Sequence, residues 1–241
     1  MSFYSSISKA YDSIFPFNPV QLEFVESCFN GTVVGKRIID AGCGTGSLAI
    51  MLARRSARVS GFDSDEKMIG LADEKRPQAL DLKFKVGDLI RELENYGKNR
   101  YDVVLCFGNT LVHLESMSMI EQFVKNAYYI LKPGGKLLIQ IVNYDRILDD
   151  NVKELPAIET PDHIFGRKYT LAPDGHIDFK TVLTNKKSGE ELTNNVLLLP
   201  VRRSSLESLA GKYFSKVDCF GDFKRNEWNN SSFHLVIKAE K

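Results

Sequence analysis

Cysteine is scarce in this sequence, and its few copies are not paired. The four cysteines are isolated from one another along 241 residues, so neither a CxxC pair nor the ligand spacing of a metal site is present. This pattern excludes a disulfide framework and indicates free thiols in a reducing compartment. We therefore expect no bound metal.

Long apolar runs and a dominant charge are also missing. No apolar run approaches the roughly 20 residues that span a bilayer, and the first fifteen residues lack the basic start and apolar core of a signal peptide. Lys and Arg (32) nearly balance Asp and Glu (31), which gives no electrostatic case for a nucleic-acid partner. We expect a cytoplasmic protein with no membrane or nucleic-acid partner.

What the sequence does contain is a strand that enters a glycine turn and then a helix. A short apolar run ends at Asp40, glycines follow at Gly42, Gly44 and Gly46, and a helix-forming stretch begins at residue 47. Such a turn directs backbone N–H groups and the positive end of the helix dipole at one point, and glycine leaves room there for a ligand. It predicts a nucleoside-like ligand, although the loop alone could be an ordinary tight turn.

Strands and helices alternate after this loop. This rhythm predicts a parallel, doubly wound sheet in an α/β domain. The expected strands are residues 57–62, 82–86, 101–106 and 136–142, with helices at 19–29, 65–76 and 116–131. A final helix at 202–213 and strands at 215–220 and 232–239 complete this part.

The pattern changes to period-two alternation between residues 163 and 200. Asp174-Gly175 and Ser188-Gly189 mark hairpin turns there, so the runs between them predict antiparallel strands. An insertion of this size is too long for a plain connection. We expect residues 1–143 and 201–241 to form the core, and residues 144–200 to form an antiparallel β lid over an acceptor site.

Carboxylates follow two of the predicted strands. Asp63 ends the second strand, where it could accept both ribose hydroxyls of an adenosine, although it or Ser64 could instead cap the next helix. Asp88 ends the third strand, where it could accept from an adenine amine while the N–H of Leu89 reaches a ring nitrogen. Asp88 could also be a turn residue. Met68 could pack on the adenine, or simply belong to the core.

The fourth strand ends in Phe107-Gly-Asn109, with His113 one turn later. Strand ends at the crevice are where α/β enzymes place their chemistry. The amide of Asn109 could orient a ligand, although Asn after Gly is also common in turns. His113 could act as a base, although a lone histidine near a helix start is more often structural.

Taken together, these segments resemble the class I S-adenosylmethionine-dependent methyltransferases. The matching motifs are IIDAGCGTGS (38–47), GFDSDEKMI (61–69), VGDL (86–89), YDVVLCFGNTLVHL (101–114) and LKPGGKLLI (131–139). The resemblance implies a seven-stranded, mostly parallel sheet with its last strand inserted antiparallel, and S-adenosylmethionine as the cofactor. The cofactor-binding residues that we predict are Tyr11, Asp40, Gly42, Cys43, Gly44, Gly46, Asp63, Ser64, Met68, Asp88, Leu89 and Phe107.

Glycine N-methyltransferase and its small-molecule relatives look similar over CFGNTLVHL (106–114), VNYDRIL (142–148) and the tail. The arginine with which those relatives hold the acceptor's carboxylate is Val142 here, and Arg146 and Arg167 are nearby candidates. A small amine is therefore the expected acceptor, rather than glycine. The Asn/Asp-Pro-Pro-aromatic motif of nucleic-acid amine methyltransferases is absent, as is the acid after strand four that a catechol-type metal site needs.

The expected reaction is in-line displacement at the sulfonium methyl, which requires an aligned acceptor and exclusion of water. We predict that Asn109 and Tyr144 position the acceptor and that Tyr11 closes over the cofactor. His113 would remove a proton if the acceptor is a hydroxyl. The alternatives are O-methylation of a small hydroxyl or carboxyl, a non-catalytic S-adenosylmethionine-binding protein, and a nucleotide-dependent oxidoreductase, whose usual third glycine is Ser47 here.

Overall fold

The computed structural model describes residues 3–241, with side chains from Ser5 onward, and contains two β-sheets. The larger sheet has seven strands in the order β10-β11-β5-β4-β1-β2-β3. Strands β1 to β5 are parallel, and β11 lies antiparallel between β5 and β10. This confirms the doubly wound sheet with an antiparallel last strand. The strands are β1 (Arg37–Ala41), β2 (Arg58–Asp63), β3 (Leu82–Val86), β4 (Tyr101–Cys106), β5 (Leu131–Val142), β10 (Lys216–Phe220) and β11 (His234–Glu240).

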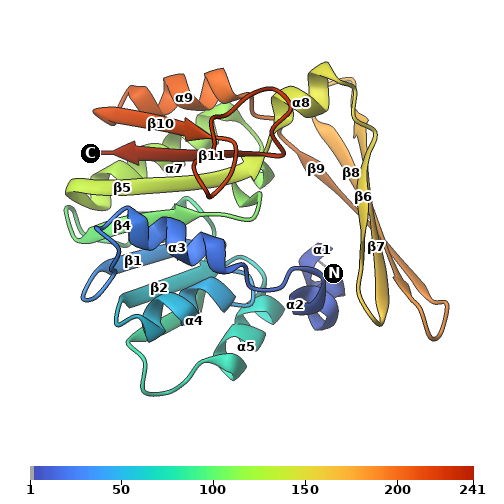
Figure 1. Ribbon diagram of the computed structural model, residues 1–241, viewed down its shortest axis with the longest axis horizontal. Helices are drawn as coiled ribbons and strands as arrows, with labels where there is room; N and C mark the ends of the chain where they lie inside the picture. The colour runs from blue at the N-terminus through green and yellow to red at the C-terminus, as the bar shows by residue number, and fades with distance from the viewer. Residues whose placement is uncertain (1–2) are drawn as a thin grey trace.

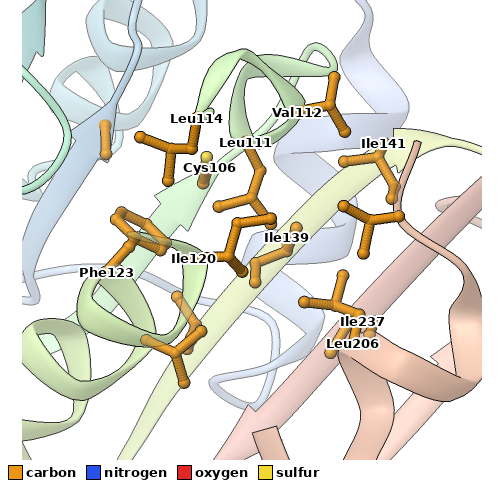
Figure 2. Packing of buried hydrophobic residues seen from close by; sticks show 14 of the residues in the cluster. Cys106, Leu111, Val112, Leu114, Ile120, Phe123, Ile139, Ile141, Leu206 and Ile237 are labelled. Carbon is orange, nitrogen blue, oxygen red and sulfur yellow. The ribbon is translucent and has the colours of Figure 1, made fainter. Parts of the chain in front are cut away.

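Helices cover both faces of this sheet (Figure 1). Helices α3 (Pro19–Ser27) and α4 (Ser47–Arg54) bury their apolar stripes on one face, against side chains such as Ile38. Helices α7 (Met117–Ile130) and α9 (Arg203–Gly211) cover the other face, where Ile120 and Leu206 meet Ile139 and Ile237 (Figure 2). Successive residues of a strand point to opposite faces, so both layers draw on each central strand. The other helical elements at the sheet are α5 (Glu66–Lys75), α6 (Arg91–Glu94) and η2 (Thr110–His113).

Several predicted boundaries are off by one or two residues, and the start of the fifth strand is off by five. The fifth strand starts at Leu131 rather than at residue 136, because the Lys-Pro-Gly-Gly stretch lies inside β5. Tyr101 pairs with Leu131, and the next pair joins Val103 to Lys136. The extra residues therefore loop out between two pairs as an irregularity of the ladder, and the chain then resumes the strand.

The second sheet is antiparallel, with the strand order β6-β7-β8-β9 (Figure 1). Its strands are β6 (Glu154–Glu159), β7 (His163–Leu171), β8 (Ile177–Asn185) and β9 (Glu191–Leu198). The three strands expected between residues 163 and 200 are confirmed. Strand β6 was not predicted; it is the edge strand of this sheet, where a proline such as Pro156 is tolerated. Helix α8 (Tyr144–Asp149) leads into this sheet from β5.

The N-terminal segment forms short helices between the two sheets. These are α1 (Phe3–Ile7), η1 (Ser8–Ala10) and α2 (Tyr11–Ile14), which lie between α5 and β7 in Figure 1. Ile7 and Ile14 are buried against Phe165 and Leu183 of the second sheet. Among residues 3–241, no helix is long and apolar enough to cross a membrane. The N-terminal helices therefore bridge the carboxyl ends of the parallel strands and the second sheet.

Candidate active site

The glycine loop joins β1 to α4 at the carboxyl end of the parallel sheet. Gly42, Gly44 and Gly46 all have positive φ (74°, 54° and 75°), a region that favours glycine. A Cβ on Gly46 would collide with the ring of Phe84, and one on Gly42 with Thr110. Packing within the chain therefore requires glycine at 42 and 46. The prediction that glycine makes room for a ligand is therefore not needed to explain Gly42 and Gly46.

Asp63 ties the end of β2 to this loop. Its Oδ2 accepts a hydrogen bond from the N–H of Gly44 (2.9 Å), and its Oδ1 accepts one from the N–H of Asp65 (3.0 Å). Asp65, not Asp63 or Ser64, caps α5, because its Oδ1 accepts from the N–H groups of Lys67 and Met68. Each carboxylate oxygen accepts more than one hydrogen bond, so Asp63 keeps capacity for ligand hydroxyls.

A second carboxylate lies buried at the end of β1. Asp40 is 4% exposed, and it accepts no hydrogen bond from the residues that the structure describes. Burial, with a smaller effect from the charge of Asp63, raises the pKa of Asp40 to about 7. Burial also raises the pKa of Asp63, against the lowering effect of its N–H donors. Two acids in this setting suit a cationic ligand, which would stabilise both in their ionised forms.

The raised pKa of Asp40 predicts a specific pH dependence of stability. Unfolded, Asp40 should titrate near 3.9, so between about pH 4 and 7 the native protein holds a proton that the unfolded chain has lost. The free energy of unfolding should therefore fall as pH rises through this window, by at most about 1.4 kcal/mol per pH unit, and level off above it. Asp40→Asn should remove this component.

Urea unfolding of the wild-type protein and of Asp40→Asn at several pH values measures this difference. The stability gained by the variant should grow from pH 4 to pH 7. Asp81→Ala is the control: it removes an exposed carboxylate and its surface ion pair with Arg58, so its effect on stability should vary little over this pH range. A gain that does not vary with pH would mean that the Asp40 carboxylate is not destabilised by burial.

Tyr11 lies over the glycine loop, as the position of its ring shows. The Cε1 atom and the hydroxyl oxygen of Tyr11 lie 3.5 Å from the place where a Cβ on Gly44 would be. Burial, followed by the charges of Asp63 and Asp12, raises the pKa of Tyr11, so its phenol stays protonated. The structure therefore brings Tyr11 to the predicted cofactor-binding loop from a distant part of the sequence.

Asp12 holds this segment in place and was missed by the sequence analysis. Its Oδ1 accepts a hydrogen bond from the hydroxyl of Thr45 in the glycine loop, and its Oδ2 pairs with Lys75 Nζ (2.6 Å) at the end of α5. Ser5 adds a hydrogen bond to Asp65 (2.7 Å). No motif marks these residues in the sequence, because their partners lie more than 30 positions away.

Asp88 lies just beyond β3 and acts as a turn residue. Its Oδ1 accepts from the N–H groups of Ile90 and Arg91 (3.0 and 2.9 Å), and its Oδ2 lies 3.9 Å from Arg91 Nε. Asp88 is exposed, and Leu89 is half-buried against the core. The turn leaves the Oδ2 atom accessible, so this geometry is compatible with the predicted adenine contact.

The remaining predicted cofactor residues differ in accessibility. Ser64 is exposed between the two aspartates, whereas Met68 is 1% exposed within α5. Cys43 is half-buried, and burial keeps its pKa high, so its thiol stays protonated. Phe107 packs against Phe223 (4.9 Å between ring centroids) on the α3 side of the sheet. Its side chain therefore contributes to the core, and only its backbone faces the strand ends.

Asn109 and Tyr144 are brought together by the ends of β4 and β5. Asn109, with φ of 67°, donates from Nδ2 to the hydroxyl of Tyr144 (3.0 Å), and its Oδ1 accepts from the N–H of Val142 (2.9 Å). Tyr144 is fully buried, and burial raises its pKa. His113 ends η2, where burial lowers its pKa to about 4, so its imidazole is neutral near pH 7.

Comparisons with known proteins agree with this geometry. Residues 38–135 match the family described as a methyltransferase domain. The ubiquinone biosynthesis O-methyltransferase of Coxiella burnetii is 32% identical over 127 residues, which cover 52% of this chain and 51% of that protein. The glycine/sarcosine N-methyltransferase of Aphanothece halophytica is 25% identical over 207 residues, covering 86% and 76% of the two chains.

The fold is shared with solved methyltransferases. The CcbJ methyltransferase from Streptomyces caelestis superimposes with a TM-score of 0.79 at 20% identity, over 96% of this chain and 94% of that one. This chain spans about half the length of the first of the curated relatives it matches. Residues 38–135 are thus similar to a methyltransferase domain, and the fold around them is that of solved methyltransferases. A solved amino pentose methyltransferase, CalS10 from Micromonospora echinaspora, has S-adenosylmethionine bound and superimposes with a TM-score of 0.66 at 17% identity, over 99% of this chain and 92% of that one.

Proposed function

We propose that this protein transfers the methyl group of S-adenosylmethionine to an amine nitrogen of a small molecule. The observation that carries this proposal is a pair of carboxylates, the buried Asp40 and the partly buried Asp63, at the glycine loop of a methyltransferase domain. Their negative charge favours a cationic donor, and Asp63 retains acceptor capacity for hydroxyls. The alignment with a glycine/sarcosine N-methyltransferase supports nitrogen as the acceptor atom.

The side chains at this site have roles that follow from their positions. S-adenosylmethionine, when bound, supplies an electrophilic methyl, whose bond to sulfur breaks as the bond to nitrogen forms. Asn109 and Tyr144 orient the acceptor in line with that bond, Tyr11 covers the loop, and the second sheet acts as the lid that excludes water. The nitrogen then loses a proton to solvent. The neutral charge balance favours a small molecule over a nucleic acid.

Asn109→Ala is expected to lower kcat about 10- to 100-fold while leaving the KM for S-adenosylmethionine within about twofold. The reason is that the amide orients the acceptor and Tyr144 but lies outside the glycine loop. Steady-state kinetics with radiolabelled S-adenosylmethionine measures both constants. Asn126→Ala, which removes an amide bonded to α7 and to Ile90, is the matched control. Full turnover by Asn109→Ala would remove Asn109 from the proposed mechanism.

A second candidate function is O-methylation of a small hydroxyl or carboxyl. The specific observation is His113, whose lowered pKa keeps the imidazole neutral near pH 7, the form that accepts a proton from a hydroxyl. The alignment with an O-methyltransferase over half the chain is in line with this candidate. If the protein methylates phenols and His113→Gln abolishes that activity without affecting the methylation of amines, oxygen is favoured as the acceptor atom.

Two experiments test the proposal as a whole. Calorimetric titration should show binding of S-adenosylmethionine and S-adenosylhomocysteine but not of NAD; the reverse result would make the protein an oxidoreductase. Radiolabelled methyl transfer to a panel of small amines, phenols and acids should then identify the acceptor. Tight binding of the cofactor without methyl transfer to any member of the panel would favour a non-catalytic binding protein.

A further inference from the structure

One row of polar side chains crosses the second sheet. Strand pairing places Arg167 of β7 opposite Thr181 of β8, and Thr181 opposite Asn194 of β9. Directly opposed residues of antiparallel strands point to the same face of a sheet. The three side chains therefore form one row, called here the lid row, on a single face. Tyr169 and Phe179, whose ring centroids are 5.2 Å apart, form the next row on this face.

The lid row lies between two apolar contacts that this face makes. On one side, Phe165 and Leu183 pack against the N-terminal helices. On the other side, Tyr169 and Leu198 belong to the core cluster that contains Tyr144. The row therefore faces the region where the N-terminal helices, the second sheet and the ends of β4 and β5 converge. In Figure 1 this region lies between β5 and β7, above α1.

Each member of the row has a buried polar atom without a hydrogen-bond partner among residues 3–241. The atoms are Arg167 Nε, Thr181 Oγ1 and Asn194 Nδ2, and Thr181 as a whole is 0% exposed. All three groups can donate a hydrogen bond. Leaving a buried donor unpaired is costly, and few such groups survive in native proteins without a reason. Three on one row indicate a ligand that carries oxygen acceptors.

The charge of Arg167 is also uncompensated. Its guanidinium donates from Nη2 to the backbone oxygen of Pro156 (2.7 Å), and it forms no ion pair with the described residues. Burial lowers its pKa, which shows that the cation is partly desolvated without an acid beside it. The other arginine near this region, Arg146, lies over the ring of Phe233. An anionic group is the partner that Arg167 lacks.

We propose that Arg167, Thr181 and Asn194 bind a carboxylate of the methyl acceptor. This inference rests on the proposed function and specifies its substrate class as a small carboxylic acid. Arg167 supplies charge and donors, and the hydroxyl and the amide complete a set of donors suited to carboxylate oxygens.

Matched acceptor pairs test the charge preference. Methyl transfer is measured with glycine and methylamine, β-alanine and ethylamine, 4-aminobenzoate and aniline, and 4-hydroxybenzoate and phenol. We expect the acid of the best pair to exceed its uncharged partner at least tenfold in kcat/KM. Arg167→Gln should lower the value for the acid about 10- to 100-fold and change that for the uncharged partner little. Lys168→Gln, at an exposed neighbour on the opposite face, should change neither.

An isosteric variant separates ligand binding from folding. Thr181→Val replaces an unpaired buried hydroxyl with a methyl group, so it should raise Tm and also raise the KM for the acid at least threefold. Thr184→Val, on the other face of β8, is its control. A higher Tm with unchanged KM, or no preference for acids in the wild-type protein, overturns the lid row as the carboxylate site.

Calorimetry on the same preparations distinguishes the two levels of the proposal. Wild-type protein that binds S-adenosylmethionine but methylates the uncharged member of each pair at least as well overturns only the carboxylate site. Protein that fails to bind S-adenosylmethionine overturns the proposed function. Binding of the cofactor together with an acid preference that Arg167→Gln abolishes supports both.

Discussion

Asp63→Ala is expected to weaken S-adenosylmethionine binding by about 1–3 kcal/mol, which is roughly 5- to 150-fold in affinity. Two losses contribute. The ligand hydroxyls lose a charged acceptor, and the N–H of Gly44 loses the carboxylate oxygen that holds it at 2.9 Å. The second loss loosens the loop itself, so the effect should appear in the affinity for S-adenosylhomocysteine as well. Isothermal titration calorimetry with both ligands measures it.

Asp81→Ala is the control for Asp63→Ala. Asp81 directly precedes β3, at the amino ends of the parallel strands and away from the glycine loop. Its carboxylate is exposed and lies 3.6 Å from Arg58. Removing it changes the net charge equally but leaves the loop untouched, so affinity should not change. Equal affinities for Asp63→Ala and Asp81→Ala would remove Asp63 from the cofactor site.

Gly46→Ala is expected to lower the free energy of unfolding by about 2–5 kcal/mol. The positive φ of Gly46 costs an alanine about 1–2 kcal/mol, and the collision of its Cβ with the ring of Phe84 adds an overpacking cost of about 1–3 kcal/mol. Because Phe84 belongs to β3, the strain falls on the sheet as well as on the loop. Urea unfolding measures the change.

Gly175→Ala separates the two costs in Gly46→Ala. Gly175 also has a positive φ (88°), but nothing lies within 4 Å of the place where its Cβ would be. Its substitution should cost only the conformational part, about 1–2 kcal/mol. Equal destabilisation of the two variants would mean that the ring of Phe84 moves aside at little cost. The positive φ alone would then explain the glycine at position 46.

The parallel sheet could be predicted because each of its signals is local. The apolar run before Asp40, the glycines after it and the alternation of strands and helices all lie within short windows, and strands β3 and β4 begin and end where the sequence indicated. The position of Asp63 followed from the same logic, since the carboxyl ends of parallel strands share one edge of a sheet. These features depend on neighbours in the sequence.

What the sequence could not supply depends on distant partners. Asp65 rather than Asp63 caps α5. Residues 63–65 are all polar and could each cap a helix, so the sequence does not say which of them the backbone places at the N-cap. Phe107 was expected at the cofactor, yet its ring packs with Phe223, more than a hundred residues away. The lid row is invisible without the register of β7, β8 and β9, because a shift of one residue would turn its side chains to the other face.

The bridge formed by the N-terminal helices has a consequence for the order of folding. Ile7 and Ile14 bury their side chains against Phe165 and Leu183, residues that lie some 150 positions later in the chain. Contacts between residues so far apart in the sequence form slowly, because bringing the intervening chain together costs entropy before the contact provides any stabilisation. Tyr11 should therefore settle over the glycine loop only after the second sheet exists. The helices α1 and α2 are therefore expected to be among the last parts of the described structure to reach their native positions.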